Sequence, residues 1–275
     1  MTDGKKTGLA LIGIGPGRVS SMTLEAVELA RHADVRLYEA YTALWSEESL
    51  KELEQEIGSI QRIMRPTIEQ PEDLLEMAKN QFIAVLVVGD PMQATTHIDL
   101  QLRAENAGIS VHIVHGISIT TLVPGATGVS NYKFGRSTTL TYPYGEWIVT
   151  SPLEVMLQNY SHRLHTLVLF DLDPSGAGTG DQQPMQASDA AESIAKMVTK
   201  YKHVELTEEQ REMIENIDLL EVVLCSDLGT DDQRLQTTTI GNLGSKSSGR
   251  LNCMVLLANL SEIEREAVYR WKCLL

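Results

Sequence analysis

The feature that most constrains this chain is an unbroken apolar run, Phe82–Val88, that stops at Gly89-Asp90-Pro91. A run without polar alternation is typical of a strand buried on both faces of a parallel sheet. Gly89 permits a sharp turn, and Pro91 cannot donate a backbone hydrogen bond. We therefore predict a central strand with Asp90 at its carboxyl end, where open α/β sheets bind ligands. The alternative is a turn aspartate that bonds only its own loop.

Residues 1–115 alternate between strand patterns and helix patterns. The other predicted strands are Leu9–Ile14, Asp34–Ala40, Ser59–Met64 and Ser110–His115. The predicted helices are Met22–His32, Glu47–Ile57, Pro71–Asn80 and residues 97–108, the last capped by Thr95 or Thr96. This alternation predicts an α/β fold in which residues 1–115 form a mostly parallel sheet with flanking helices.

The pattern changes after His115, because Gly116–Gly135 is rich in glycine and has no clear period. We place the domain junction there and predict that residues 116–275 form a second, mixed α/β domain. Its predicted strands are residues 137–142, 165–172, 219–225, 233–240 and 251–257, and its predicted helices are residues 152–160, 188–200, 207–216 and a last one from 261. Asp173–Gln186 reads as a surface loop.

Charge and cysteine content narrow the classes of partner. The net charge of −14 argues against a nucleic-acid backbone or an anionic membrane as the main partner. No apolar stretch is long enough to span a membrane, and the apolar core of the N-terminus is too short for a signal peptide. The cysteines Cys225, Cys253 and Cys273 lack paired spacing, which favours a reducing cytoplasm over a disulfide framework.

Several catalytic motifs are absent from the sequence. The seven histidines show no zinc-ligand spacing, so no metal site is expected and His112 and His115 are interpreted as core or surface residues. No GxSxG elbow and no phosphate-binding loop ending in GK[ST] occurs. Metal-dependent hydrolysis, acyl transfer and nucleoside triphosphate hydrolysis therefore have no support. The tryptophans are expected to pack rather than to stack on a ligand.

A glycine-rich turn, Gly13-Ile14-Gly15-Pro16-Gly17, follows the first predicted strand. Such a turn, with Glu39 closing the second strand to bind ribose hydroxyls, is typical of dinucleotide-binding folds. The spacing is GxGxG rather than GxGxxG, and a turn without a ligand fits equally well. A Rossmann oxidoreductase therefore stays open as an alternative.

Six segments together resemble the diphthine synthase family, which belongs to the tetrapyrrole methylase-like class III methyltransferases. They are GIG near the N-terminus, EAYTA at 39–43, GDPMQATTH at 89–97, HGISI at 115–119, NYKFGRSTTLTYP at 131–143 and LHTLVLFDLD at 164–173. The resemblance implies methylation of the amino group of the modified histidine of translation elongation factor 2, with S-adenosylmethionine as methyl donor. It also implies two α/β domains with the cofactor in the cleft between them, and a cytoplasmic homodimer.

The resemblance also assigns the cofactor contacts, many of which use backbone groups. They are Pro16, Asp90, Gln93, Ser118, Ile119, Phe170, Cys225 and Asn252. It names no catalytic base. The segment Asp173–Gln186 is a candidate lid or docking loop, with a linker of no function as the alternative.

The chain departs from the family pattern at several of these positions. Pro16 replaces an aliphatic residue, Ala43 a serine and Asn252 a histidine, while Cys225-Ser226-Asp227 replaces an Ala-Arg pattern and Pro124 reads as a one-residue insertion. Two other functions stay open. One is methylation of a tetrapyrrole intermediate, and the other is nucleotide binding without methylation.

Overall fold

The computed structural model describes residues 7–93, 95–143, 145, 147–180, 182–201 and 206–272. The chain divides into two units. The first unit comprises residues 1–119 and 177–181, and the second comprises residues 120–176 and 182–275. The predicted junction followed His115; the structural division follows Ile119.

The first unit is built on a sheet whose strand order is β3-β2-β4-β1-β5. Its strands are β1 (Gly8–Gly13), β2 (Val35–Glu39), β3 (Gln61–Ile63), β4 (Phe82–Val87) and β5 (Val111–Val114). Every neighbouring pair runs parallel, with Leu11 of β1 opposite Val85 on one side and Ile113 on the other. The predicted parallel sheet with a central strand at Phe82 is therefore confirmed.

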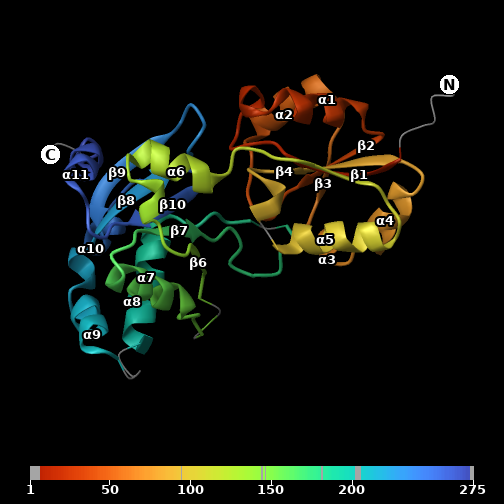
Figure 1. Ribbon diagram of the computed structural model, residues 1–275. Helices are drawn as coiled ribbons and strands as arrows, with labels where there is room; N and C mark the ends of the chain where they lie inside the picture. The colour runs from red at the N-terminus through yellow and green to blue at the C-terminus, as the bar shows by residue number, and fades with distance from the viewer. Residues whose placement is uncertain are drawn as a thin grey trace. The chain divides into compact units, whose positions relative to one another are not determined.

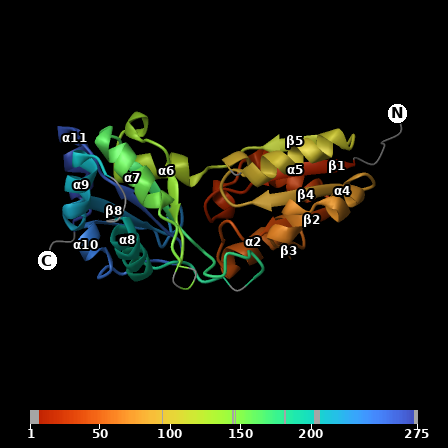
Figure 2. The same cartoon turned by 90° about the horizontal axis from the view of Figure 1, so that it is seen from below.

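Alternate residues of these strands enter two separate cores, as the two-residue period of a strand requires. Ala10 and Ile12 face helices α1 (Leu24–His32) and α2 (Glu47–Ile57). Leu9 and Leu11 face the opposite group of helices. That group consists of α3 (Arg65–Glu69), α4 (Glu72–Ala78) and α5 (Thr95–Asn106). The first unit is thus a three-layer α/β/α structure (Figures 1 and 2).

Local signals set the ends of these helices. Thr23 accepts a hydrogen bond from Ala26 N and caps α1, and Ser46 accepts one from Ser49 N and caps α2. Helix α5 begins at Thr95, earlier than predicted, and the predicted cap by the Thr95 side chain lies outside what the structure describes. Helix α3, with its proline in the first turn, was not predicted.

The second unit holds a mixed sheet with the order β6-β7-β10-β8-β9. Its strands are β6 (Thr138–Leu140), β7 (Thr166–Phe170), β8 (Glu221–Ser226), β9 (Arg234–Thr239) and β10 (Asn252–Leu256). Strands β6 and β7 are parallel, while β10 pairs antiparallel with both β7 and β8. The prediction of a mixed second sheet is confirmed.

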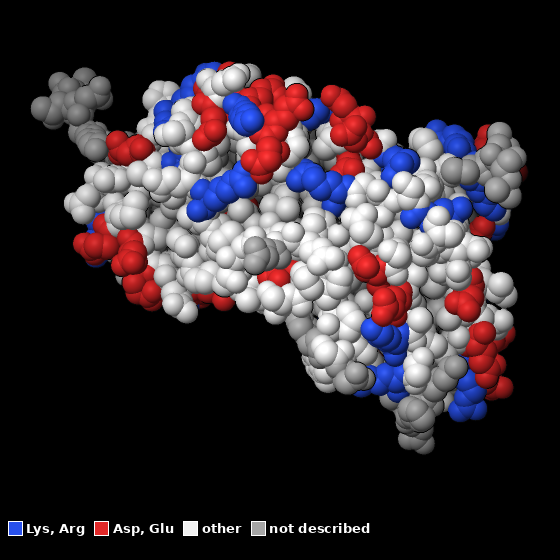
Figure 3. Space-filling view, turned by 180° about the vertical axis from the view of Figure 1, so that it is seen from behind, with Lys and Arg blue, Asp and Glu red and all other residues white. Residues whose placement is uncertain are grey.

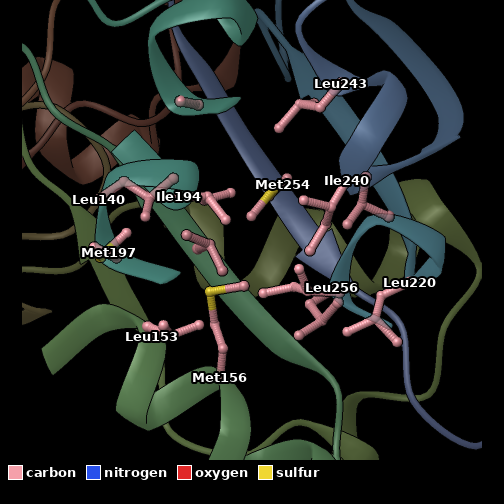
Figure 4. Close-up of a cluster of buried hydrophobic side chains, with 14 of the residues drawn as sticks. Leu140, Leu153, Met156, Ile194, Met197, Leu220, Ile240, Leu243, Met254 and Leu256 are labelled. Atoms are coloured by element: carbon pink, nitrogen blue, oxygen red, sulfur yellow. The ribbon is translucent and has the colours of Figure 1, made fainter. Parts of the chain in front are cut away.

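One face of this sheet carries the large core of the second unit. The helices on this face are α7 (Ser151–Ser161), α8 (Ala187–Tyr201), α9 (Glu208–Glu215) and α10 (Ile240–Leu243). Leu153 and Met156 of α7 and Ile194 of α8 gather against Met254 and Leu256 of β10 (Figure 4). A capping box begins α9: the side chains of Thr207 and Gln210 each accept a hydrogen bond from the other's backbone N–H.

Helices α6 (Ile119–Thr127) and α11 (Glu262–Tyr269) complete the second unit. Helix α6 was expected to be irregular, and Pro124, read as a loop insertion, lies inside it. Thr237 of β9 donates its hydroxyl proton to Val268 O, which fastens α11 to the sheet. None of the helices in the described ranges combines the length and apolarity that a membrane span requires.

A buried ion cluster joins the YKFG segment to α11. Lys133 Nζ lies 2.5 Å from Glu264 Oε2, and Ser130 N and Ser261 N donate to the same carboxylate. Burial opposes the charge of Glu264, but the hydrogen bonds, led by that from Lys133, outweigh it and hold the pKa of this carboxyl well below its ordinary range. The fully buried His165 accepts a hydrogen bond from Ala258 N, and burial lowers its pKa to about 4.

The segment Asp173–Gln186 is held at several points. Asp173 accepts bonds from Ser175, and Gln183 N and Met185 N donate to the backbone of residues 172 and 171. Residues 177–181 belong to the first unit, where Gly178 O accepts a bond from Arg65 N. Hydrogen bonds therefore hold this segment at several positions, although parts of it are exposed.

Candidate functional site

Three glycine-containing turns meet at the carboxyl edge of the first sheet. A Cβ atom on Gly116 would lie 2.1 Å from Gly89 O, and one on Gly13 would lie 2.5 Å from Gly116 N. Gly15 and Gly89 also exchange backbone hydrogen bonds of 3.2 and 2.9 Å. The turns after β1, β4 and β5 thus touch backbone to backbone, which only glycine permits at this separation.

This edge is also the switch point of the sheet. Strand β1 leads to α1 on one face, whereas β4, its neighbour, leads to α5 on the other face. The two connections diverge and leave the carboxyl ends of β1 and β4 free of a covering helix. Open α/β sheets bind their ligands at such points.

Asp90 is fixed between the turns after β4 and β5. Its Oδ1 accepts a hydrogen bond from Met92 N at 2.8 Å, and its Oδ2 accepts one from Gly116 N at 3.2 Å. His115 Nδ1 lies 2.8 Å from the same Oδ2. Asp90 therefore bonds the loop after β5, which lies on the far side of β1, as well as its own loop, and its side chain is only 9% exposed.

The other residues predicted to contact the cofactor in the first unit gather near Asp90. Pro16 lies in the turn after β1, half-buried. Gln93 is exposed at the end of the 3-10 turn Pro91–Gln93 that follows Asp90. Ser118 is buried, and Ile119 begins α6 directly after it. The structure thus brings these residues together on the edge formed by the ends of β1, β4 and β5.

A network of buried polar side chains supports the loop that carries Asp90. His97 Nδ1 lies 3.0 Å from Pro91 O, and its Nε2 lies 3.5 Å from Glu39 Oε2. Glu39 also accepts bonds from the backbone of Tyr41 and Thr42 and from the Thr42 hydroxyl. Both Glu39 and His97 are fully buried, so Glu39 is not free to bind ribose.

Two buried aromatic residues follow β2 and lie in the cores on opposite faces of the first sheet. Trp45 is buried and donates from its indole N–H to Gly15 O at 3.1 Å, so it packs and positions the glycine turn as expected of a packing residue. Burial, with Glu39 adding to it, raises the pKa of Tyr41 to about 12. Tyr41 therefore stays protonated at neutral pH and does not act as a base.

The predicted residues of the second unit share one edge of its sheet. Phe170 ends β7, Cys225 lies near the end of β8, and Asn252 begins β10 opposite Ser226. The Asn252 amide bonds Ser226, Gly249 and Met185, and the Cys225 thiol is buried beside Cys253. The side chains of Cys225 and Asn252 are therefore engaged within the protein.

The geometry weighs against one of the alternatives, a Rossmann oxidoreductase. The strand order β3-β2-β4-β1-β5 differs from the 3-2-1-4-5 order of a Rossmann sheet, and the acidic residue expected to hold ribose is buried. Within the described ranges, no group of three or more His, Cys, Asp or Glu side chains is arranged to hold a metal ion. The site instead offers backbone groups, one fixed carboxylate and one imidazole.

Two histidines of this site were not identified from the sequence. His115 was interpreted as a core or surface residue, and His97 was noted only as part of a motif. Each lies in a segment that also carries a glycine turn, but their partners Asp90 and Glu39 are distant in sequence. The available signal was that Asp90, His115 and Glu39 all lie at or just after the carboxyl ends of predicted parallel strands, and these ends share one edge.

Comparison with known proteins assigns the family. The family profile of the tetrapyrrole (corrin/porphyrin) methylases matches residues 8–244. The diphthine synthase of Methanospirillum hungatei is 36% identical over 166 residues, which is 60% of this chain and 66% of that protein, just under two thirds of its length. The diphthine synthase of Methanocorpusculum labreanum is 30% identical over 266 residues, covering 96% of this chain and 98% of that protein.

A solved structure agrees with these matches. A crystal structure of diphthine synthase superimposes with a TM-score of 0.80 at 29% identity, covering 96% of this chain and 95% of that one. The likeness therefore includes both units and the order of their elements. The chain belongs to the tetrapyrrole methylase family and, within it, to the diphthine synthases.

Proposed function

We propose that this protein uses S-adenosylmethionine to methylate the amino group of the modified histidine side chain of translation elongation factor 2, in diphthamide biosynthesis. The observation that carries this proposal is the full-length likeness to diphthine synthases, in sequence and in fold. The convergence of three glycine turns at the switch point of the first sheet supports it, because this is where such a sheet binds a small ligand.

The proposed cofactor contacts come from both units. The first unit contributes Pro16, Asp90, Gln93, Ser118 and Ile119, and the second contributes Phe170, Cys225 and Asn252. Because Asp90, Cys225 and Asn252 are bonded within the protein, they act chiefly by shaping the backbone around the ligand. When bound, S-adenosylmethionine supplies an electrophilic methyl group on a sulfonium.

The protein has three tasks in such a transfer. It holds the acceptor nitrogen about 3–3.5 Å from the methyl carbon and in line with the breaking bond. It excludes competing water. It also needs the acceptor nitrogen to be unprotonated at the moment of attack, because an ammonium has no lone pair with which to attack.

Surface charge is consistent with a protein acceptor rather than a nucleic acid. The net charge is −14, and basic and acidic side chains are interspersed over the face shown in Figure 3. Nucleic-acid binding relies on many phosphate contacts from basic residues. We further propose a cytoplasmic homodimer, and the buried free thiols of Cys225 and Cys253 fit the reducing conditions of that compartment.

Methyl transfer to the proposed acceptor tests the function. Elongation factor 2 carrying the unmethylated histidine adduct is incubated with the protein and S-adenosylmethionine labelled in its methyl group. Label on the adduct, located by peptide mass spectrometry, is the expected result, and elongation factor 2 without the adduct is the control. Labelling only of a tetrapyrrole intermediate would favour the second activity of the fold. Cofactor binding without transfer to either acceptor would contradict the proposal.

A further inference from the structure

We propose that His115 is the base that takes the proton from the acceptor amine and that Asp90 positions it. This inference rests on the proposed function and adds the catalytic group that the sequence did not name. Its basis is the direct pairing of these two side chains at the carboxyl edge of the first sheet.

The hydrogen bond between the two side chains fixes which imidazole nitrogen is free. His115 Nδ1 lies 2.8 Å from Asp90 Oδ2, and a carboxylate only accepts hydrogen bonds. In the neutral imidazole, Nδ1 therefore carries the proton and Nε2 has the free lone pair. The same logic orients the histidine of a serine protease triad, where a buried carboxylate selects the tautomer.

The Asp90 and His115 side chains differ in solvent exposure, as a positioning carboxylate and a base require. The Asp90 side chain is 9% exposed, whereas that of His115 is 72% exposed. The carboxylate is thus shielded while the ring is open to an approaching acceptor. His115 makes no hydrogen bond through Nε2 within the described contacts.

Backbone hydrogen bonds hold the Asp90–His115 pair in place. Met92 N and Gly116 N each donate to the Asp90 carboxylate, so both of its oxygens are held by backbone groups. Gly116 follows His115 directly and touches Gly89, which precedes Asp90. The two loops therefore cannot move independently, and the His115 ring is held at the edge that also carries Pro16 and Ser118.

The other ionisable groups of this edge are unsuited to the task. Glu39 and His97 are fully buried and face each other. Tyr41, with a pKa of about 12, holds its proton at neutral pH. Asp90, from the loop after β4, is the charged group that contacts His115.

The proton and electron balance of the step is simple. The acceptor arrives as an ammonium, and His115 Nε2 takes one proton from it to give an imidazolium and a neutral amine. The amine lone pair then forms the N–C bond as the C–S bond breaks, and the sulfur leaves with that electron pair as a neutral thioether. The imidazolium, stabilised by Asp90, returns its proton to water.

The test compares pH profiles of single-turnover methyl transfer for the wild-type protein and three variants at saturating S-adenosylmethionine. His115→Ala removes the base, Asp90→Asn removes the charge of its positioning partner, and His32→Ala is the matched control. His32 is an exposed histidine at the end of α1, bonded to the backbone oxygen of Glu28. Calorimetric titration with S-adenosylmethionine measures cofactor affinity for each protein.

We expect His115→Ala to slow transfer about 100-fold, as removal of a general base does, while its affinity for S-adenosylmethionine changes by less than about threefold. The wild-type rate should fall at acid pH, because a protonated imidazole cannot act as a base, and His115→Ala should lose this pH dependence. Added imidazole should restore part of the rate of His115→Ala. Asp90→Asn should give an intermediate loss, and His32→Ala should match the wild type.

Failure of the inference is distinguishable from failure of the proposed function. If the wild-type protein transfers methyl to elongation factor 2 but His115→Ala keeps the wild-type rate and still slows at acid pH, His115 is not the base. If imidazole restores nothing while cofactor binding is intact, His115 has a structural role only. If the wild-type protein itself transfers no methyl group, the proposed function is wrong.

Discussion

The carbonyl oxygen of Gly89 lies directly against the Cα atom of Gly116, so that a Cβ there would be only 2.1 Å away. Two turns that are distant in sequence, one at Gly89 and one at Gly116, are thereby joined without any side chain between them. The contact holds Asp90 next to His115 and sets the width of the edge at which a ligand is expected. It explains why the turn after β4 and the turn after β5 both contain glycine.

Gly116→Ala should destabilise the first unit and abolish cofactor binding. The new methyl group would meet backbone atoms, which cannot move aside as a flexible side chain does. Overpacking of this kind costs about 1–3 kcal/mol. Urea denaturation measures the loss of stability and calorimetric titration measures the loss of affinity.

Gly125→Ala is the matched control for this substitution. Gly125 lies inside α6, and a Cβ there meets no atom within 4 Å. The change should be neutral or stabilising by up to about 1 kcal/mol, because alanine favours a helix over glycine. Equal destabilisation by both substitutions would show that the Gly89–Gly116 contact has no special role.

Asp90→Ala should weaken S-adenosylmethionine binding at least tenfold, about 1.4 kcal/mol. The substitution removes the acceptor for Met92 N, Gly116 N and His115 and so releases the loop that carries Gln93. Titration calorimetry measures the affinity, with His32→Ala again as the control. Unchanged affinity would remove Asp90 from the cofactor site.

Glu39 and His97 should be coupled in a double-mutant cycle. His97→Leu removes the bond to Pro91 O and leaves a buried carboxylate without its imidazole, which should cost about 3–5 kcal/mol. Glu39→Gln in the same background should recover part of this loss, because the buried charge is then gone. Urea denaturation of the two single variants and the double variant gives the coupling. Strict additivity would contradict a direct pairing of these residues.

The stability of the second unit should fall as the pH is lowered from about 6.5 to 4. Burial lowers the pKa of His165 to about 4, so between these values the unfolded chain binds a proton that the folded chain does not. Stability is complete above the unfolded value and declines toward the folded one, by ~3 kcal/mol if His165 acts alone. Below about pH 4.5, protonation of Glu264 adds to the loss, because its folded pKa is depressed as well.

Thermal unfolding between pH 4 and 8 tests this dependence. His165→Gln should reduce the change in unfolding temperature between pH 4.5 and 6.5, whatever its effect on overall stability. His162→Gln is the matched control, since His162 is exposed in the turn before β7 and bonds only local groups. A profile that keeps its slope in His165→Gln would assign the dependence to other residues.

Much of the fold follows from local signals in the sequence. The unbroken apolar run of β4, the caps Thr23 and Ser46 and the capping box of α9 each act within a few residues, so their elements could be predicted close to their observed bounds. Helix α6 was missed because Pro124 and Gly125 are typical of loops. In the structure Pro124 lies past the first turn of α6, whose buried residues are Val123 and Thr127, and the Thr127 hydroxyl donates to Val123 O.

The site was only partly predictable, for a physical reason. The position of Asp90 at a strand end depends on its neighbours in sequence, and the family resemblance then grouped it with Pro16 and Ser118. The pairing of Asp90 with His115 depends on β5 lying beside β1, next to β4, and that order is set by how the helices cross the sheet. Local sequence does not encode it, so the partner of Asp90 appeared only in the structure.

The most direct test of the proposed site is a crystal structure of the protein with S-adenosylhomocysteine, the product that remains when the methyl group is lost. We predict the ligand at the carboxyl edge of the first sheet, against Pro16, the Asp90–Gln93 loop and Ser118, with His115 Nε2 facing the place of the missing methyl group. A ligand bound at any other edge, or no binding at millimolar concentration, would contradict this assignment.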